Sequence, residues 1–186
     1  MSAAAKSPAE LIADLTDQVR LLRQDGGLHP EVGVYAVAAV QEEIGSRGAQ
    51  IAAHRINART GLAVDMGQAT DYPNADVRRY GVLDIGKGPG IDRGANTSDA
   101  VFDILMQAAT EDDIACQVHA TAGTTPTDAQ VMQISLNGMA TGLLSVPLRY
   151  MHTPCEVIDL ADLDRTAQLA AAYCRLIRPD TDFCPR

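Results

Sequence analysis

The alternation of short apolar runs with segments of helical periodicity constrains the fold of this chain more than any other feature. Apolar, strand-like runs cover residues 32–40, 61–64, 115–120 and 142–146. Helical patterns separate and flank these runs, over residues 7–26, 45–58, 97–109, 127–138 and 160–177. Strands that alternate with helices form parallel sheets covered by helices. The sequence therefore predicts an α/β fold, a three-layer sandwich whose mostly parallel central sheet is flanked by helices.

Two segments carry more specific expectations. The run from Val32 to Val40 is nearly continuous and contains β-branched residues, which is typical of a strand buried on both faces. Residues 72–96 are rich in Gly, Pro and Asp and are expected to form loops, with one short strand from Val82 to Ile85. The first helix is expected to open with a capping box, in which Ser7 is the N-cap and Glu10 follows three residues later.

Length, charge and cysteine content exclude several classes of protein. The 186 residues fit one domain. The net charge of -9, with no basic face, argues against a nucleic-acid partner. No stretch approaches the ~20 apolar residues of a membrane span. The cysteines form no CxxC pair, so free thiols in a reducing cytoplasm are expected for Cys116, Cys155, Cys174 and Cys184.

Acidic and imidazole side chains follow three of the predicted strands. Glu42 and Glu43 come after the first strand, Asp65 after the second, and His152 a few residues after the fourth. Because ligands bind outside the carboxyl ends of strands in open α/β sheets, we expect these side chains to converge on one edge. Carboxylates and neutral imidazole are suitable ligands for Zn²⁺ and similar ions. One of two adjacent glutamates can bind the ion while the other accepts a proton from water.

Each of these residues also has an ordinary structural interpretation. A Glu-Glu pair at a turn is usually solvated. Asp65 can cap a turn or a helix, and a single histidine such as His152 is often exposed or hydrogen-bonded. His29, His54 and His119 lack partners at metal-ligand spacing and are interpreted as structural or exposed. The metal hypothesis therefore depends on the joint placement of the candidate residues.

Six stretches of the sequence form a family pattern: residues 37–49 (VAAVQEEIGSRGA), 63–66 (AVDM), 84–89 (DIGKGP), 127–129 (TDA), 145–154 (SVPLRYMHTP) and 156–159 (EVID). Their order and spacing resemble those of the glutamyl or deblocking metallo-aminopeptidases, whose TET-like members form large hollow tetrahedral particles. The resemblance extends from about residue 10 to residue 177. It implies the zinc-aminopeptidase fold, with a sheet that is incomplete at the amino-terminal side in this chain.

The resemblance implies a role for each candidate residue. Glu42 would be the general base, Glu43 and His152 would bind one metal ion, and Asp65 would bind the second. Asp128 would lie near the site and contact the substrate. The implied cofactor is a divalent metal, Zn or Co, with two ions per site. The implied reaction removes the amino-terminal residue from a short peptide, and the implied assembly is a homo-oligomer.

Two ligands of the family's site have no counterpart in this sequence. The family has an upstream His in a His-x-Asp motif and an Asp that bridges the two metals where the helix before the Glu-Glu strand begins. Here that helix opens at Ser7, and Asp14 falls inside it. Pro126 also stands where the family usually has Gly. Because two divalent ions ~3.5–4 Å apart repel each other and a bridging carboxylate offsets that repulsion, a paired site is expected to bind weakly.

Residues 1–186 are accordingly expected to form a single partial catalytic domain, the carboxyl-terminal part, without the family's inserted smaller domain. The expected function is that of a metal-dependent aminopeptidase-like hydrolase in an incomplete form. The alternative is a non-catalytic assembly or interaction subunit, which the missing bridging Asp favours. A glycosidase that uses Glu42 and Glu43 is disfavoured, because adjacent carboxylates do not easily flank a sugar bond at ~5–9 Å. Nucleotide binding is disfavoured too, because Gly86 to Gly90 fits neither phosphate-loop pattern.

Overall fold

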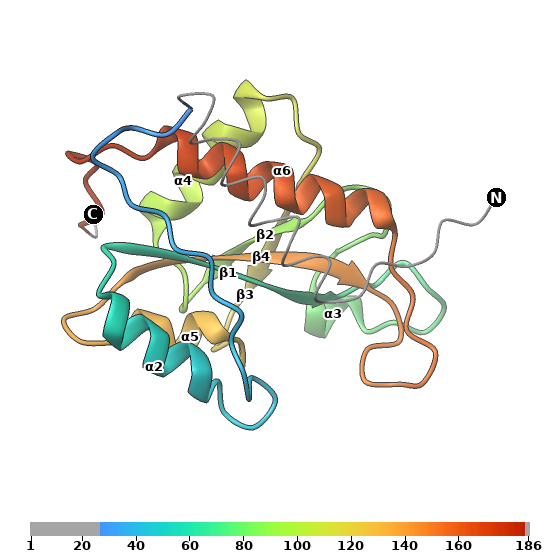
Figure 1. The fold of residues 1–186 in the computed structure, drawn as a ribbon. Helices are drawn as coiled ribbons and strands as arrows, with labels where there is room; N and C mark the ends of the chain where they lie inside the picture. Colours follow the sequence, from blue (N-terminus) through green and yellow to red (C-terminus); the bar gives the residue numbers. More distant parts are fainter. Residues whose placement is uncertain (1–26, 185–186) are drawn as a thin grey trace.

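The computed structural model describes residues 27–184 and confirms the predicted α/β architecture. Figure 1 shows a central sheet between two layers of helices. The helix expected over residues 7–26 lies wholly outside the described residues. The elements follow one another in the order α2 (Arg47–Ile56), β1 (Thr60–Gln68), α3 (Val77–Tyr80), β2 (Gly90–Gly94), α4 (Asp99–Glu111), β3 (Gln117–Thr121), α5 (Asp128–Gln133), β4 (Ala140–Leu148) and α6 (Leu160–Leu176).

The sheet has the strand order β1-β4-β2-β3 and is mostly parallel. β1 and β4 pair in parallel over their whole length, from Thr60 opposite Ala140 to Gln68 opposite Leu148. β2 and β3 are also parallel, whereas β2 and β4 are antiparallel. The inner strand β4 is buried along almost all of its length, as expected for a strand covered by helices on both faces.

Apolar clusters lie on the two faces of the sheet. On one face, α4 and α6 cover the larger cluster, which includes Ile91, Val101, Leu105, Leu144 and Leu169. On the other face, beside α5, the smaller cluster contains Ala63, Ala129 and Leu143. Neighbouring residues of β4 belong to opposite clusters because strand side chains alternate between the faces of a sheet. Within residues 27–184, no helix has the length and apolar character needed to cross a bilayer.

The strand predicted from Val32 to Val40 is wrong. An extended segment becomes a strand only when a neighbour pairs its backbone N–H and C=O groups, and no described strand pairs with this one. Tyr35 and Val37 are exposed rather than buried. At the end of the segment, the Gly48 N–H donates to the Val40 carbonyl at 2.9 Å. A Cβ at Gly48 would lie 2.5 Å from the Val40 nitrogen, so this sharp turn into α2 requires glycine.

The strand predicted from Val82 to Ile85 is also wrong, and β2 forms at Gly90–Gly94 instead. Leu83 is fully buried, but its backbone bonds to Thr70 outside any strand. Its carbonyl accepts from the Thr70 N–H at 2.8 Å, and its N–H donates to Thr70 Oγ1 at 3.2 Å. In β2, a Cβ at Gly94 would lie 2.3 Å from the Thr121 carbonyl oxygen, so the close approach of β3 excludes larger residues there.

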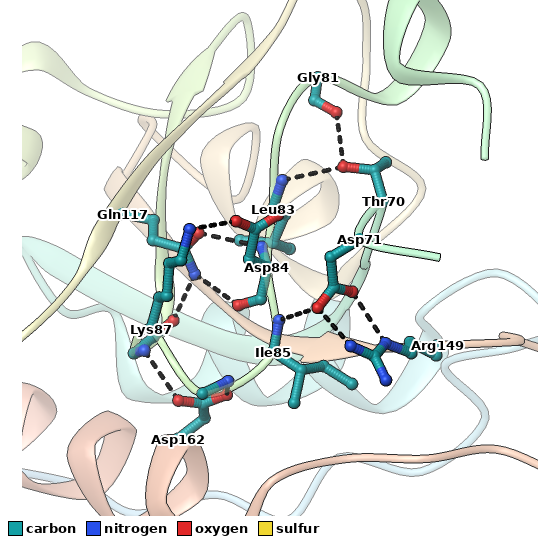
Figure 2. A network of polar contacts seen from close by, with 12 residues as sticks. Thr70, Asp71, Gly81, Leu83, Asp84, Ile85, Lys87, Gln117, Arg149 and Asp162 are labelled. Atoms are coloured by element: carbon teal, nitrogen blue, oxygen red, sulfur yellow. Dashed lines mark hydrogen bonds and ion pairs between the residues drawn. The ribbon is translucent and has the colours of Figure 1, made fainter. Parts of the chain in front are cut away.

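A carboxylate of the protein closes the glycine-rich loop at residues 86–90. Asp162, in the first turn of α6, is fully buried and accepts the Gly86 N–H at 2.6 Å and the Gly88 N–H at 2.7 Å (Figure 2). Arg165 donates to the same carboxylate at 3.1 Å. Backbone N–H groups that point at one site, as those of Gly86 and Gly88 do, form anion-binding concavities. Asp162 therefore occupies the position that a phosphate would take in a phosphate-binding loop.

Replacing Asp162 by alanine is expected to lower the free energy of unfolding by about 3–5 kcal/mol, because it leaves buried donors without an acceptor. Urea unfolding followed by circular dichroism measures the change. The matched control is Asp164→Ala, at an exposed position of the same helix, for which a change within about 0.5 kcal/mol is expected. Equal effects of the two substitutions would contradict the structural role of Asp162.

Candidate metal centre

Three segments position Glu42, Glu43, Asp65 and His152. Glu42 and Glu43 lie in the turn that precedes α2, and His152 lies in the loop that follows β4. Asp65 differs from the expectation in one respect. It lies inside β1 rather than beyond its end, because the strand continues to Gln68. In the ladder, Asp65 stands opposite Ser145.

Glu43 and His152 lie next to each other although they are far apart in the sequence. The His152 Nε2 atom is 3.5 Å from Glu43 Oε1. The two side chains are 71% and 76% exposed, so water has access to both. The backbone N–H of His152 donates to Glu156 Oε1 at 2.6 Å, which holds the histidine loop closed on itself. One carboxylate and one imidazole therefore face each other at the surface.

Burial and, after it, neighbouring negative charge raise the pKa values of Glu42 and Asp65, the carboxylates beside this pair. Partial burial is the main cause that raises the pKa of Glu42, and the charges of Asp65, Glu43 and Asp128 raise it further. Burial also raises the pKa of Asp65; a hydrogen bond from the Met66 N–H opposes the rise, and the nearby charges of Asp128 and Glu43 add to it. This mutual repulsion is the electrostatic situation that a bound cation relieves.

The start of α5, at its N-cap Thr127 and its first residue Asp128, contributes two oxygen atoms without a partner among the described residues. Thr127 Oγ1 and Asp128 Oδ1 are buried and have no hydrogen-bond partner among the described residues. Burial raises the pKa of Asp128, and a hydrogen bond from Ser46 lowers it. A buried polar atom without a hydrogen-bond partner lowers the stability of the fold by about 1–3 kcal/mol. A bound molecule that donated hydrogen bonds to these two oxygen atoms would remove that cost.

The described residues fit a weak metal centre with few protein ligands. Within residues 27–184, no three His, Cys, Asp or Glu side chains are close enough together to hold an ion. Glu43 and His152 offer two ligands of types that Zn²⁺ accepts, and water can occupy the open positions. Asp65 adds negative charge near Glu43 and His152, but it does not form a three-ligand group with them.

A second polar cluster, which the sequence did not reveal, is buried between β2, β3 and β4. Asp92 accepts a hydrogen bond from His119 Nδ1 at 2.8 Å and another from the Ser145 hydroxyl. The other ring nitrogen of His119 lies 2.8 Å from the Tyr80 carbonyl oxygen. A carbonyl only accepts hydrogen bonds, so Nε2 carries a proton, and Nδ1 donates to the carboxylate. The structure thus indicates a charged imidazolium paired with Asp92, which gives His119 a structural role.

This pair makes the stability of the fold depend on pH. The hydrogen bond to Asp92 is the main cause that raises the pKa of His119 above its ordinary value. The folded protein therefore holds this proton more tightly than the unfolded chain does. The resulting stabilisation is complete below the ordinary histidine pKa of about 6.5 and is lost as the pH rises through the folded-state value.

His119→Gln is expected to cost about 3 kcal/mol of unfolding free energy at about pH 6, because it leaves Asp92 buried without its cation. The difference from the unmodified protein is expected to shrink as the pH is raised toward about 9. Urea unfolding at a series of pH values measures both effects. His54→Gln, at an exposed position of α2, is the control and is expected to show neither. A loss that does not vary with pH would contradict a charged His119.

Comparison with known proteins agrees with the family suggested by the motifs. Residues 18–169 match the M42 glutamyl aminopeptidase family. The chain is 41% identical over 155 residues to the lysyl aminopeptidase of Pyrococcus furiosus, and the match covers 83% of this chain and 44% of that protein.

Solved structures show the same fold. A TET aminopeptidase from a marine sediment archaeon of the Thaumarchaeota superposes with a TM-score of 0.81 at 25% identity, over 91% of this chain and 47% of that one. The TET1 peptidase of Pyrococcus horikoshii, which can assemble into a tetrahedron or a large octahedral shell, superposes with a TM-score of 0.62 at 29% identity, over 75% and 40%. The chain spans less than half the length of these relatives. It belongs to the M42 glutamyl aminopeptidase family.

Proposed function

We propose that residues 1–186 form a single partial catalytic domain, the carboxyl-terminal part of a metal-dependent aminopeptidase that removes amino-terminal residues from short peptides. The approach of His152 to Glu43, at 3.5 Å and beside the carboxylates of Glu42 and Asp65, is the observation that supports the proposal most directly. Membership of the family, together with coverage of less than half of its relatives, supports the partial character of the domain.

Glu43 and His152 are proposed to hold one divalent ion, Zn²⁺ or Co²⁺, and Asp65 a second. Such an ion supplies Lewis acidity, which polarises the peptide carbonyl and lets water act as a nucleophile near neutral pH. Water and solute reach Glu43 and His152 freely because both side chains are mostly exposed. The two-ligand arrangement predicts an affinity well below that of a site with four protein ligands.

Glu42 is proposed to act as the general base. It would take a proton from the attacking water and pass it to the nitrogen of the departing amine as the C–N bond breaks. Burial and the charges of Asp65 and Glu43 raise its pKa, which brings the carboxylate nearer to the range in which proton transfer is efficient at neutral pH.

Asp128 is proposed to contact the substrate. Its buried Oδ1 lacks a partner among residues 27–184, and its charge raises the pKa values of Glu42 and Asp65, so it lies beside the proposed reacting groups. A free carboxylate oxygen in that place is suited to the positively charged amino terminus of a peptide.

The proposal includes assembly into a homo-oligomer, which the shells formed by the Pyrococcus horikoshii relative support. Exposed apolar side chains at Tyr35, Val40 and Ile44 give the chain surface that association would bury. A cytoplasmic location is proposed as well, because the four cysteines are all free thiols.

The second candidate is a non-catalytic assembly subunit that keeps the peptidase fold. The observation that favours it is the lack of a three-ligand group within the described part of the chain. This subunit would associate with other chains but would neither retain a metal ion nor hydrolyse peptides.

Hydrolysis of aminoacyl-p-nitroanilides by the full chain with added Zn²⁺ or Co²⁺ tests the enzyme proposal. Glu42→Gln is expected to lower turnover by about 10²–10⁴-fold while the bound metal remains, because it removes only the base. His152→Ala is expected to lower the metal content itself. Glu31→Gln, an exposed glutamate away from the turn, is the control and should leave both quantities unchanged.

Metal content is measured by atomic emission after dialysis. A chain that retains no metal and shows no turnover would refute the enzyme proposal. If sedimentation then showed a defined oligomer, the assembly subunit would be the supported function.

A further inference from the structure

An ion pair joins the loops that leave β1 and β4. Arg149 donates from Nε to Asp71 Oδ1 at 2.9 Å and from Nη2 to Asp71 Oδ2 at 2.5 Å (Figure 2). Asp71 Oδ2 also accepts the Ile85 N–H at 3.2 Å, so the carboxylate is tied to a third segment. Paired, nearly parallel N–H···O bonds of this kind fix direction as well as distance. The hydrogen bonds from Arg149 are the main cause that holds the pKa of Asp71 below its ordinary value, so the carboxylate stays ionised.

The sheet register explains why these two residues meet. Gln68 and Leu148 are the last paired residues of β1 and β4, and the Ala69 N–H donates to the Leu148 carbonyl at 2.9 Å. Arg149 directly follows Leu148, and Asp71 lies three residues beyond Gln68. The ion pair therefore links the two chain segments just beyond the last backbone hydrogen bonds of the β1–β4 ladder.

Arg149 is also the base of the loop that carries His152. An antiparallel bridge closes the loop between Arg149 and Val157, with N···O distances of 3.0 and 3.2 Å. A second link lies just beyond the ion pair, where the rings of Tyr72 and Tyr150 have centroids 4.9 Å apart. The loop is therefore anchored at its base by an ion pair, a backbone bridge and an aromatic contact.

The geometry of the loop shows that these anchors determine its shape. Tyr150 and His152 have φ angles of 61° and 60°, in the left-handed region that non-glycine residues rarely adopt. Such residues persist where the surrounding structure imposes their conformation. The His152 ring is 71% exposed, and Glu43 is the neighbour to which it is paired. Its position is consequently set through the backbone of the loop rather than by packing of the ring.

We propose that Asp71 and Arg149 are positioning residues, which together hold His152 at the distance from Glu43 that a shared metal ion requires. The inference rests on the proposed function for its purpose, because it assigns the ion pair to the ligands of the same centre. By holding one ligand in place, the ion pair would raise the metal affinity of a centre that has few protein ligands. Ligands held in place by surrounding contacts lose less entropy when an ion binds.

Three variants of the full chain test the proposal. Arg149→Met removes both hydrogen bonds and keeps the length of the side chain, whereas Arg149→Lys keeps the charge but loses the paired geometry. Arg175→Met is the matched control, because it breaks the ion pair of Arg175 with Asp112, which is similarly exposed and joins α6 to the end of α4. Thermal unfolding of each variant shows whether it remains folded. Asp71→Asn, which retains acceptor capacity, replaces Arg149→Met if that variant does not fold.

The first readout needs no metal. In the unmodified chain, Glu43→Gln is expected to shift the ring proton resonances of His152 in the NMR spectrum, because the two side chains touch. The same substitution is expected to have no effect on these resonances in the Arg149→Met background, and its full effect in the Arg175→Met background. A shift that persists after Arg149→Met would overturn the proposal.

The second readout is Co²⁺ affinity, measured by titration of the visible absorption spectrum. Arg149→Met is expected to weaken binding at least tenfold, Arg149→Lys to restore part of the loss, and Arg175→Met to have no effect. Binding by Arg149→Met as tight as that of the unmodified chain would overturn the positioning role. If the unmodified chain binds no Co²⁺, the proposed function fails, and the NMR contact alone decides whether the ion pair positions His152.

Discussion

The parallel ladder between β1 and β4 determines where the polar residues of the candidate centre stand. A shift of one residue in its register would turn every side chain of a strand to the opposite face. A Cβ at Gly142 would lie 2.6 Å from Val101 Cγ1, so a shift that placed Thr141 or Leu143 at this position would bring it into a clash with α4. The same register sets Asp65 opposite Ser145 and ends both strands at one level. Apolar packing in the core thus specifies the arrangement of charged groups at the end of the sheet.

The sequence predicted those elements whose signal is local. The expected helix over residues 160–177 agrees closely with α6 (Leu160–Leu176), because helical periodicity depends only on residues close together in the sequence. The strand expected over residues 32–40 failed because burial on two faces depends on neighbours that composition cannot specify. β2 was missed because glycine at Gly90 and Gly94 weakens the strand signal, although close strand approach requires it.

The candidate site was predictable to a similar extent. The juxtaposition of Glu43 and His152 follows from motif order and from the tendency of polar residues to gather at the carboxyl ends of strands. Pairs such as Asp92 with His119 could not be foreseen. Which acidic side chain lies beside which basic one depends on the strand register and on the path of the loops. Neither of these produces a recognisable spacing of residues in the sequence. Glu43 and His152 are farther apart in the sequence than Asp92 and His119, so the family motifs, and not closeness in sequence, made the first pair predictable.

The carboxylate of Asp162 takes the place of an external anion in the glycine-rich loop at residues 86–90. An anion that belongs to the chain has a constant effective concentration, which dilution does not lower. Inorganic phosphate or nucleotide in the cell competes poorly against such an internal ligand. The loop therefore needs no anion from solution to keep its conformation.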